Sequence, residues 1–200
     1  QVAQSKMSLL RTLAQGSLVL ATLLGATAAV PLTLVPAQAS AEARARKLAL
    51  LIGIDHYGAK YQKGVSPTEQ WSALDGTVND VTSLRAELEK RGFEVLVLTN
   101  DQATKPGILK AFRDHLIGKS EAGRGDVLFF HYSGHGQQIP DDNGKPDEAD
   151  GYDEAIVPYD NKGVSNYSQH IRDDELGLLL AEASKKTDNL VVSLDSCHSG

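Results

Sequence analysis

The sequence predicts an α/β fold, in which a mostly parallel sheet carries helices on both faces. Short continuous apolar runs alternate along the chain with longer segments whose apolar residues recur at helical spacing. The apolar runs lack the alternation of a strand that has one face in water, so we expect both of their faces to be covered. With 41% hydrophobic and 23% charged residues, the 200-residue chain has the composition of a globular domain and not of a disordered segment.

The first half of this pattern gives two strands and two helices. KLALLIGID (residues 47–55) is the first strand, and a helix lies within residues 76–92, ended by Gly92. FEVLVLT (residues 93–99) is the second strand, and residues 104–117 form the second helix. The apolar faces of the two helices are formed by Val78, Val81, Leu84 and Leu88, and by Ile108, Leu109, Phe112 and Leu116.

The second half adds two strands and one helix. DVLFFHYS (residues 126–133) is the third strand and runs directly into Gly-His-Gly. After an acidic segment, EAIVPYD (residues 154–160) is a short extended piece. Residues 173–184 form a helix that opens on acidic residues, which suit its positive end, and NLVVSLD (residues 189–195) is the last strand.

The first 39 residues differ from the rest. No charged residue lies between Arg11 and Glu42, and the apolar stretch ends in Ala37, Gln38 and Ala39. A basic start, an apolar stretch and a small-x-small end predict a signal peptide over residues 1–39, a separate folded domain over residues 40–200, and export to the periplasm or the cell exterior. The alternative is a membrane anchor formed by residues 12–36, although two prolines there disfavour one continuous helix.

Two strand ends carry reactive side chains. The third strand ends in HYSGHG and the last in DSCHSG, which places His135 and Cys197 directly after strands although they are 62 positions apart. Parallel strands end at the same edge of a sheet, where α/β proteins place their sites. We therefore expect His135 and Cys197 to lie close together.

This pair has the composition of a nucleophilic site. A cysteine thiolate attacks acyl carbon when a neighbouring histidine takes its proton, and that histidine can later protonate the leaving group. The backbone N–H groups of Gly136 and Cys197 could hold the resulting oxyanion. The alternative is that Cys197, the only cysteine, is a buried inert thiol, and the residues alone leave both readings open. His131 is expected to be a hydrogen-bonded core histidine, and His198 is the second choice as the base.

The segment from Asp141 to Glu154 is strongly acidic. It holds seven carboxylates against one lysine. A solvated surface loop and a calcium site are both open, because clustered carboxylates are the ligands that calcium prefers but the spacing does not fit a regular 12-residue calcium loop. The overall charge of −6 gives no electrostatic footprint for nucleic acid.

HYSGHG followed by DSCHSG, with DGYDEAIVPYD and DDEL between them, resembles the large catalytic subunit of the metacaspases, which are caspase-like cysteine peptidases. The resemblance covers residues 47–200 and implies a caspase-hemoglobinase-like fold and peptide-bond hydrolysis by Cys197 and His135. It also implies an acidic pocket formed by Asp80 and Asp195 that selects arginine or lysine before the scissile bond. The alternative for Asp80 is a carboxylate that only stabilises the first turn of its helix.

The resemblance further implies calcium as an activator and a second polypeptide segment as a partner. Asp150, Asp173 and Asp174 match the metal-binding positions of the family. The family also needs a small subunit after the cysteine, with two more strands, and we expect residues 47–200 alone to be poorly active and prone to edge pairing. A non-catalytic caspase-like interaction scaffold and an exported metal-binding protein are the alternative functions.

Overall fold

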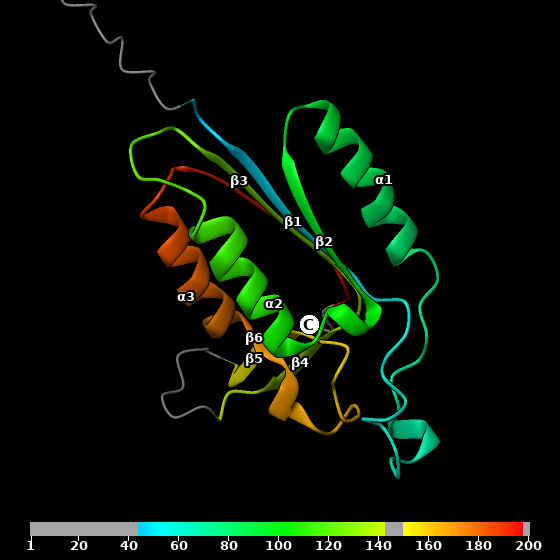
Figure 1. Cartoon of the computed structure of the whole chain (residues 1–200). Coiled ribbons are helices and arrows are strands. Elements are labelled where there is room, and N and C mark those ends of the chain that lie inside the picture. Colours follow the sequence, from blue (N-terminus) through cyan, green and yellow to red (C-terminus); the bar gives the residue numbers. More distant parts are fainter. Residues whose placement is uncertain (1–43, 143–149, 198–200) are drawn as a thin grey trace, which may run out of the picture. The chain divides into compact units, whose positions relative to one another are not determined.

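The computed structural model describes residues 44–142 and 150–197 (Figure 1). The expected signal peptide and His198 lie outside the described residues. Among the helices that are described, none is long and apolar enough to cross a bilayer. The strands are β1 (Lys47–Gly53), β2 (Glu94–Thr99), β3 (Val127–Ser133), β4 (Gly136–Pro140), β5 (Tyr152–Ile156), β6 (Ile171–Arg172) and β7 (Asn189–Asp195), and the α-helices are α1 (Thr77–Lys90), α2 (Lys105–Ala111) and α3 (Asp173–Ser184).

The main sheet has four strands in the order β2-β1-β3-β7, and every pairing in it is parallel. Helix α1 covers one face, and α2 and α3 cover the other (Figure 1). β1 lies inside the sheet, and its residues from Leu48 to Gly53 are all buried, as its continuous apolar run predicts. The predicted α/β fold with helices on both faces is confirmed.

Apart from Val78, which is half-buried and outside both core clusters, the apolar residues predicted for the first two helices pack in the core. Val81 and Leu88 of α1 are buried against Ala49 and Leu51 of β1. On the other face, the larger core cluster joins the sheet to α2, to the segment after it and to α3. Its helical members include Ile108, Phe112, Leu116, Leu176, Leu179 and Ala183.

Two features of the fold depart from the prediction. The second helix ends as an α-helix at Ala111 and continues as a π-helix over Phe112–Ile117, in which Phe112 and Leu116 remain in the core. A second sheet, β4-β5-β6, is antiparallel and lies beyond the carboxyl end of β3. The short extended piece predicted at residues 154–160 is β5, which begins at Tyr152 and ends at Ile156.

β7 forms one edge of the main sheet. Three of its apolar side chains are exposed, with exposed fractions of 48% for Val191, 38% for Val192 and 50% for Leu194. An edge strand with apolar side chains in water is a surface on which another strand can pair.

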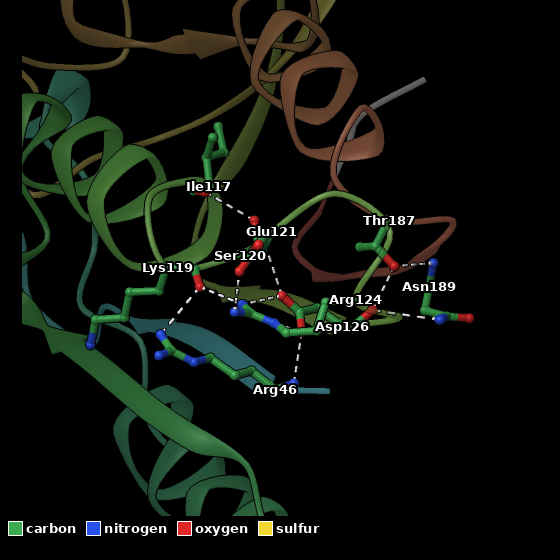
Figure 2. Close-up of polar contacts among 9 residues, drawn as sticks. All are labelled: Arg46, Ile117, Lys119, Ser120, Glu121, Arg124, Asp126, Thr187 and Asn189. Atoms are coloured by element: carbon green, nitrogen blue, oxygen red, sulfur yellow. Dashed lines mark hydrogen bonds and ion pairs between the residues drawn. The ribbon is translucent and has the colours of Figure 1, made fainter. Parts of the chain in front are cut away.

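At the opposite end of the strands, the carboxylate of Asp126 holds three segments together (Figure 2). Its two oxygens accept hydrogen bonds from the backbone N–H groups of Arg46 (2.7 Å) and Glu121 (2.9 Å), and from Arg124 Nε (2.7 Å) and Nη2 (2.6 Å). Its backbone carbonyl accepts from the hydroxyl of Thr187 at 2.5 Å. Asp126 is fully buried. Its carboxylate ties the start of β1 to the start of β3, and its backbone carbonyl ties the segment before β7 to the same place.

Candidate active site

The carboxyl ends of β3 and β7 bring His135 and Cys197 to one place. Ser133 and Asp195 are partners in the parallel register, and each candidate residue lies two positions beyond its member of this pair. The backbone N–H of Gly134 donates to the carbonyl of Asp195 at 3.2 Å, so the two chains stay together past the sheet. The predicted proximity of the two segments is confirmed.

The imidazole of His135 is held by two aromatic side chains and by a hydrogen bond at one nitrogen. Its ring lies against those of Tyr57 and Trp71, with centroids 5.1 and 5.0 Å apart. Its Nε2 is 3.0 Å from the backbone carbonyl oxygen of Ser72, which can only accept a hydrogen bond. Nε2 therefore carries the proton, and Nδ1 is the nitrogen that can accept one.

The backbone of His135 is fixed by two buried tyrosines. Its N–H donates to the hydroxyl of Tyr57 (2.8 Å), and the hydroxyl of Tyr132 donates to its carbonyl oxygen (2.6 Å). Burial raises the pKa of Tyr57 to about 12, more than its hydrogen bonds to His135 and Tyr132 lower it. Both hydroxyls therefore stay protonated in water at ordinary pH and keep these bonds.

Cys197 is an exposed free thiol and not a buried core residue. Beside it lies a small apolar recess of about 70 Å³, whose lining includes Gly136, Ile156, Ile171, Asp173, Leu176 and Leu194. The alternative that Cys197 is buried is therefore wrong. The polar setting expected from its sequence neighbours is found only in part, because the recess beside it is mainly apolar.

Gly136 lies against the cysteine backbone. A Cβ atom added to it would stand 2.1 Å from the carbonyl oxygen of Cys197 and 3.1 Å from Ser196 Oγ. The backbone N–H of Val157 donates to the carbonyl of His135, so these two residues form a hydrogen-bonded pair of the β4–β5 ladder. Hydrogen-bonded pairs alternate with non-hydrogen-bonded pairs in an antiparallel ladder, and Gly136, the next residue, belongs to a non-hydrogen-bonded pair. Its N–H therefore points away from β5, toward the open side of β4.

Asp80 and Asp195 are both exposed and lie near His131. Asp195 accepts a hydrogen bond from the hydroxyl of Ser133 (3.3 Å), and Asp80 is in the first turn of α1. His131 is buried, and its Nδ1 is 3.0 Å from Ser193 Oγ, so it is a hydrogen-bonded core histidine as predicted. Burial lowers the pKa of His131, while the charges of Asp195 and, to a smaller degree, Asp80 act in the opposite direction.

The three residues expected to bind calcium lie on two segments. Asp150 is exposed and accepts hydrogen bonds from the side chain of Gln138 (3.3 Å) and from the backbone of Tyr152 (3.2 Å). Asp173 and exposed Asp174 open α3. Within residues 44–142 and 150–197, no three His, Cys, Asp or Glu side chains form a group that could hold a metal ion.

Asp173 nevertheless has an unusual setting. Its Oδ1 is buried and has no hydrogen-bond partner in the part of the chain that the structure describes. Burial raises the pKa of this carboxyl, and the neighbouring carboxylates of Asp153, Asp174 and Glu154 raise it further. A cation near Asp173 would relieve both effects.

The sequence did not indicate the residues that hold His135. Tyr57, Trp71 and Ser72 lie in the loop between β1 and α1, which has no apolar periodicity to place them. The one available signal was the presence of three aromatic residues, Tyr57, Tyr61 and Trp71, in a mostly polar loop. Asn161 and His170, which contact Trp71, were missed for the same reason.

A family model described as metacaspase, peptidase C14 domain, matches residues 47–200. The chain belongs to the metacaspase family. Metacaspase-1A of Aspergillus terreus is 39% identical over 165 residues, covering 78% of this chain and 36% of the relative. Metacaspase-1 of Sclerotinia sclerotiorum is also 39% identical, and 34% of it is covered. The chain thus spans about a third of the length of these metacaspases.

The fold of this metacaspase is also similar to that of a solved structure. A Geobacter sulfurreducens protein known from its crystal structure matches with a TM-score of 0.59 at 30% identity, over 78% of this chain and 52% of that protein. The caspase-hemoglobinase-like fold expected from the motifs is confirmed. The metacaspase match includes both strand ends that carry His135 and Cys197.

Proposed function

We propose that this metacaspase is a cysteine endopeptidase that cleaves peptide bonds after arginine or lysine. The observation that carries the proposal is the placement of His135 and Cys197, each two residues beyond the Ser133–Asp195 register pair. Membership of the peptidase C14 family supports the same chemistry.

In the proposed reaction, Nδ1 of His135 takes the thiol proton and the sulfur of Cys197 attacks the carbonyl carbon of the scissile bond. The N–H groups of Gly136 and Cys197 hold the oxyanion. When the C–N bond breaks, the imidazolium gives its proton to the leaving amine. Water, deprotonated by the same imidazole, then attacks the thioester and releases the acid product and the thiol.

The proposed partner is a small-subunit segment that pairs with β7. The exposed apolar side chains of β7 and its position at the sheet edge support this pairing. The relatives that match are about three times as long as the matched part, which leaves room in them for such a segment. The assays below use this chain together with its small-subunit strands, and we refer to that combination as the assembled enzyme.

Gly136→Ala is expected to lower kcat/KM by about 100-fold or more, because the added methyl group cannot fit 2.1 Å from the Cys197 carbonyl and must move the cysteine backbone. The assembled enzyme is assayed on an arginyl peptide, and its thermal unfolding is followed in parallel. Gly177→Ala is the matched control, since a Cβ at this helical glycine meets no atom within 4 Å. Equal activity of the Gly136 and Gly177 variants would contradict the proposed placement of the nucleophile.

Asp80 and Asp195 supply the proposed selectivity for basic residues. Both carboxylates are exposed: Asp195 ends β7, and Asp80 is in the first turn of α1. The charges of both act on His131. A substrate guanidinium or ammonium can form charge-assisted hydrogen bonds with carboxylates, and an acidic side chain would be repelled. We test this with fluorogenic peptides that differ only in Arg, Lys or Asp before the scissile bond. Preferred cleavage after Asp would overturn the assignment.

Asp195→Asn is expected to lower kcat/KM on the arginyl peptide by about 10- to 100-fold, because the neutral amide loses a charge-assisted hydrogen bond but keeps its shape. Activity on a peptide with a neutral residue in that position should change much less. Asp188→Asn is the matched control at the exposed opposite end of β7. A uniform loss on both peptides would show that Asp195 acts on the fold and not on the substrate.

We propose calcium as the activator of this metacaspase. The buried, unpartnered Oδ1 of Asp173 and its raised pKa support a cation at the start of α3. Asp174 and Asp150 are the further oxygen donors that the family resemblance implies, and they do not form a group with Asp173 among the described residues. When bound, the ion would neutralise these carboxylates and order the segments that carry them. A chelator should lower kcat/KM, and Asp173→Asn should remove the response to calcium. Full activity in the chelator would overturn this part of the proposal.

A further inference from the structure

Trp71 links the candidate base to a buried polar network. Its indole packs on His135 with centroids 5.0 Å apart, and its Nε1 donates to Asn161 Oδ1 at 2.8 Å. Ser72, whose carbonyl accepts from His135 Nε2, is the next residue in the chain. The position of Trp71 therefore determines where the indole that packs on His135 lies. It also determines where the Ser72 carbonyl lies, which fixes the tautomer of His135.

Asn161 is fully buried, and both ends of its amide are used. Oδ1 accepts from Trp71 Nε1 and from the backbone N–H of Gly163 (3.0 Å). Nδ2 donates to Nδ1 of His170 at 3.0 Å. Oxygen and nitrogen cannot exchange places without breaking these bonds, so the orientation of the amide is fixed.

His170 closes the network back onto the strand that follows His135. It is 1% exposed, and because its Nδ1 accepts from Asn161, its Nε2 carries the proton and donates to Gln137 Oε1 at 2.8 Å. Gln137 is on β4, two residues after His135. Burial lowers the pKa of His170 to about 4, so the imidazole stays neutral and keeps this tautomer at ordinary pH.

We infer that Asn161 and His170 are positioning residues for His135, acting through Trp71 and Gln137. Neither contacts the imidazole of His135. Together they form a closed ring of contacts that runs from His135 to Trp71, Asn161, His170, Gln137 and back along β4. This cycle of contacts fixes the separation of Trp71 and β4, and it thereby fixes the position of the His135 imidazole. The inference rests on the proposed function, in which His135 is the base.

The kinetic test compares Asn161→Ala with the wild-type assembled enzyme on an arginyl peptide. We expect kcat to fall by about 10- to 100-fold with KM changed by less than about threefold, because a displaced base slows the chemical step without touching the substrate pocket. Asn166→Ala is the matched control in the same loop: its side chain accepts from Ser168, and the carbonyl that accepts from Asn161 Nδ2 belongs to its backbone and is kept, so kcat should be unchanged. Trp71→Phe keeps an aromatic ring against His135 and removes the N–H that donates to Asn161. It tests the connection between Trp71 and Asn161 if Asn161→Ala is unstable, and its kcat should fall several-fold.

A second readout needs no peptidase activity. An imidazolium quenches the fluorescence of an indole packed against it, and Trp71 is the only tryptophan of the 200 residues. The fluorescence of Trp71 is obtained by subtracting the signal of the Trp71→Phe counterpart from that of each protein. A change of this fluorescence with pH that is lost in His135→Gln reports the contact between His135 and Trp71. Asn161→Ala should strongly reduce this step, and Asn166→Ala should leave it intact.

The two readouts separate the inference from the function on which it rests. A normal pH step together with a normal kcat in Asn161→Ala overturns the positioning role, whatever the substrate is. A wild-type enzyme that cleaves no peptide overturns the proposed function, while the fluorescence step still decides whether Asn161 holds Trp71 against His135.

Discussion

His135→Ala is expected to lower kcat/KM of the assembled enzyme on an arginyl peptide by about 10³-fold or more. The imidazole is the group that takes the thiol proton and protonates the leaving amine, and general acid–base catalysis contributes about 10²- to 10⁴-fold. No other histidine of the described residues occupies its position between Tyr57, Trp71 and the Ser72 carbonyl. Steady-state kinetics over a range of substrate concentrations measures the loss.

His56→Ala is the matched control for this experiment. His56 is an exposed histidine in the loop that follows β1, and its backbone N–H donates to Asn100 Oδ1, a bond that the substitution keeps. Its kcat/KM should stay within about twofold of wild type, as for a surface residue. More than a tenth of wild-type activity in His135→Ala would contradict the role of His135.

Asp126→Ala is expected to lower the free energy of unfolding by about 3 kcal/mol, because it leaves the Arg124 guanidinium and the N–H groups of Arg46 and Glu121 without their acceptor. For a domain of this size, that corresponds to a fall of roughly 6–12 °C in Tm. Thermal and urea unfolding measure the change. Glu182→Ala, at an exposed position of α3, is the control and should change stability by less than about 0.5 kcal/mol.

The stabilisation by Asp126 should depend on pH in a defined direction. Hydrogen bonds from Arg124 hold the pKa of this buried carboxyl well below its usual range, more than burial raises it. A carboxyl with a lowered folded-state pKa stabilises the protein above its unfolded-state pKa of about 3.9 and loses that contribution as pH falls further. The stability difference between wild type and Asp126→Ala should therefore be constant above about pH 5 and shrink below pH 4. A difference that grows toward acid would contradict this account.

The main sheet could be predicted from the sequence because its strands are continuous apolar runs. β1 and β7 lie where KLALLIGID and NLVVSLD indicated, and the parallel pairing that follows from alternating strands and helices placed Cys197 beside Gly136. The antiparallel sheet could not be predicted in this way. β4 reads GQQIP and β6 has two residues, so neither shows a period, and both exist because β5 lies between them.

The candidate site was predictable only in part for a related reason. His135 and Cys197 come directly after strands, so the sheet places them. Trp71, Asn161 and His170 lie in loops, where their positions follow from hydrogen bonds between segments up to 90 positions apart in the sequence. Such contacts leave no periodic pattern along the chain.

The most direct test of the account is covalent labelling of the assembled enzyme with a peptide probe that carries an arginine and a thiol-reactive ketone, followed by mass spectrometry of the labelled site. The account predicts rapid labelling of Cys197, much slower labelling in His135→Ala, and little labelling by the matching aspartyl probe. Labelling at another residue, or labelling of Cys197 at the same rate in wild type and His135→Ala, would contradict the claim that these two residues form the catalytic pair.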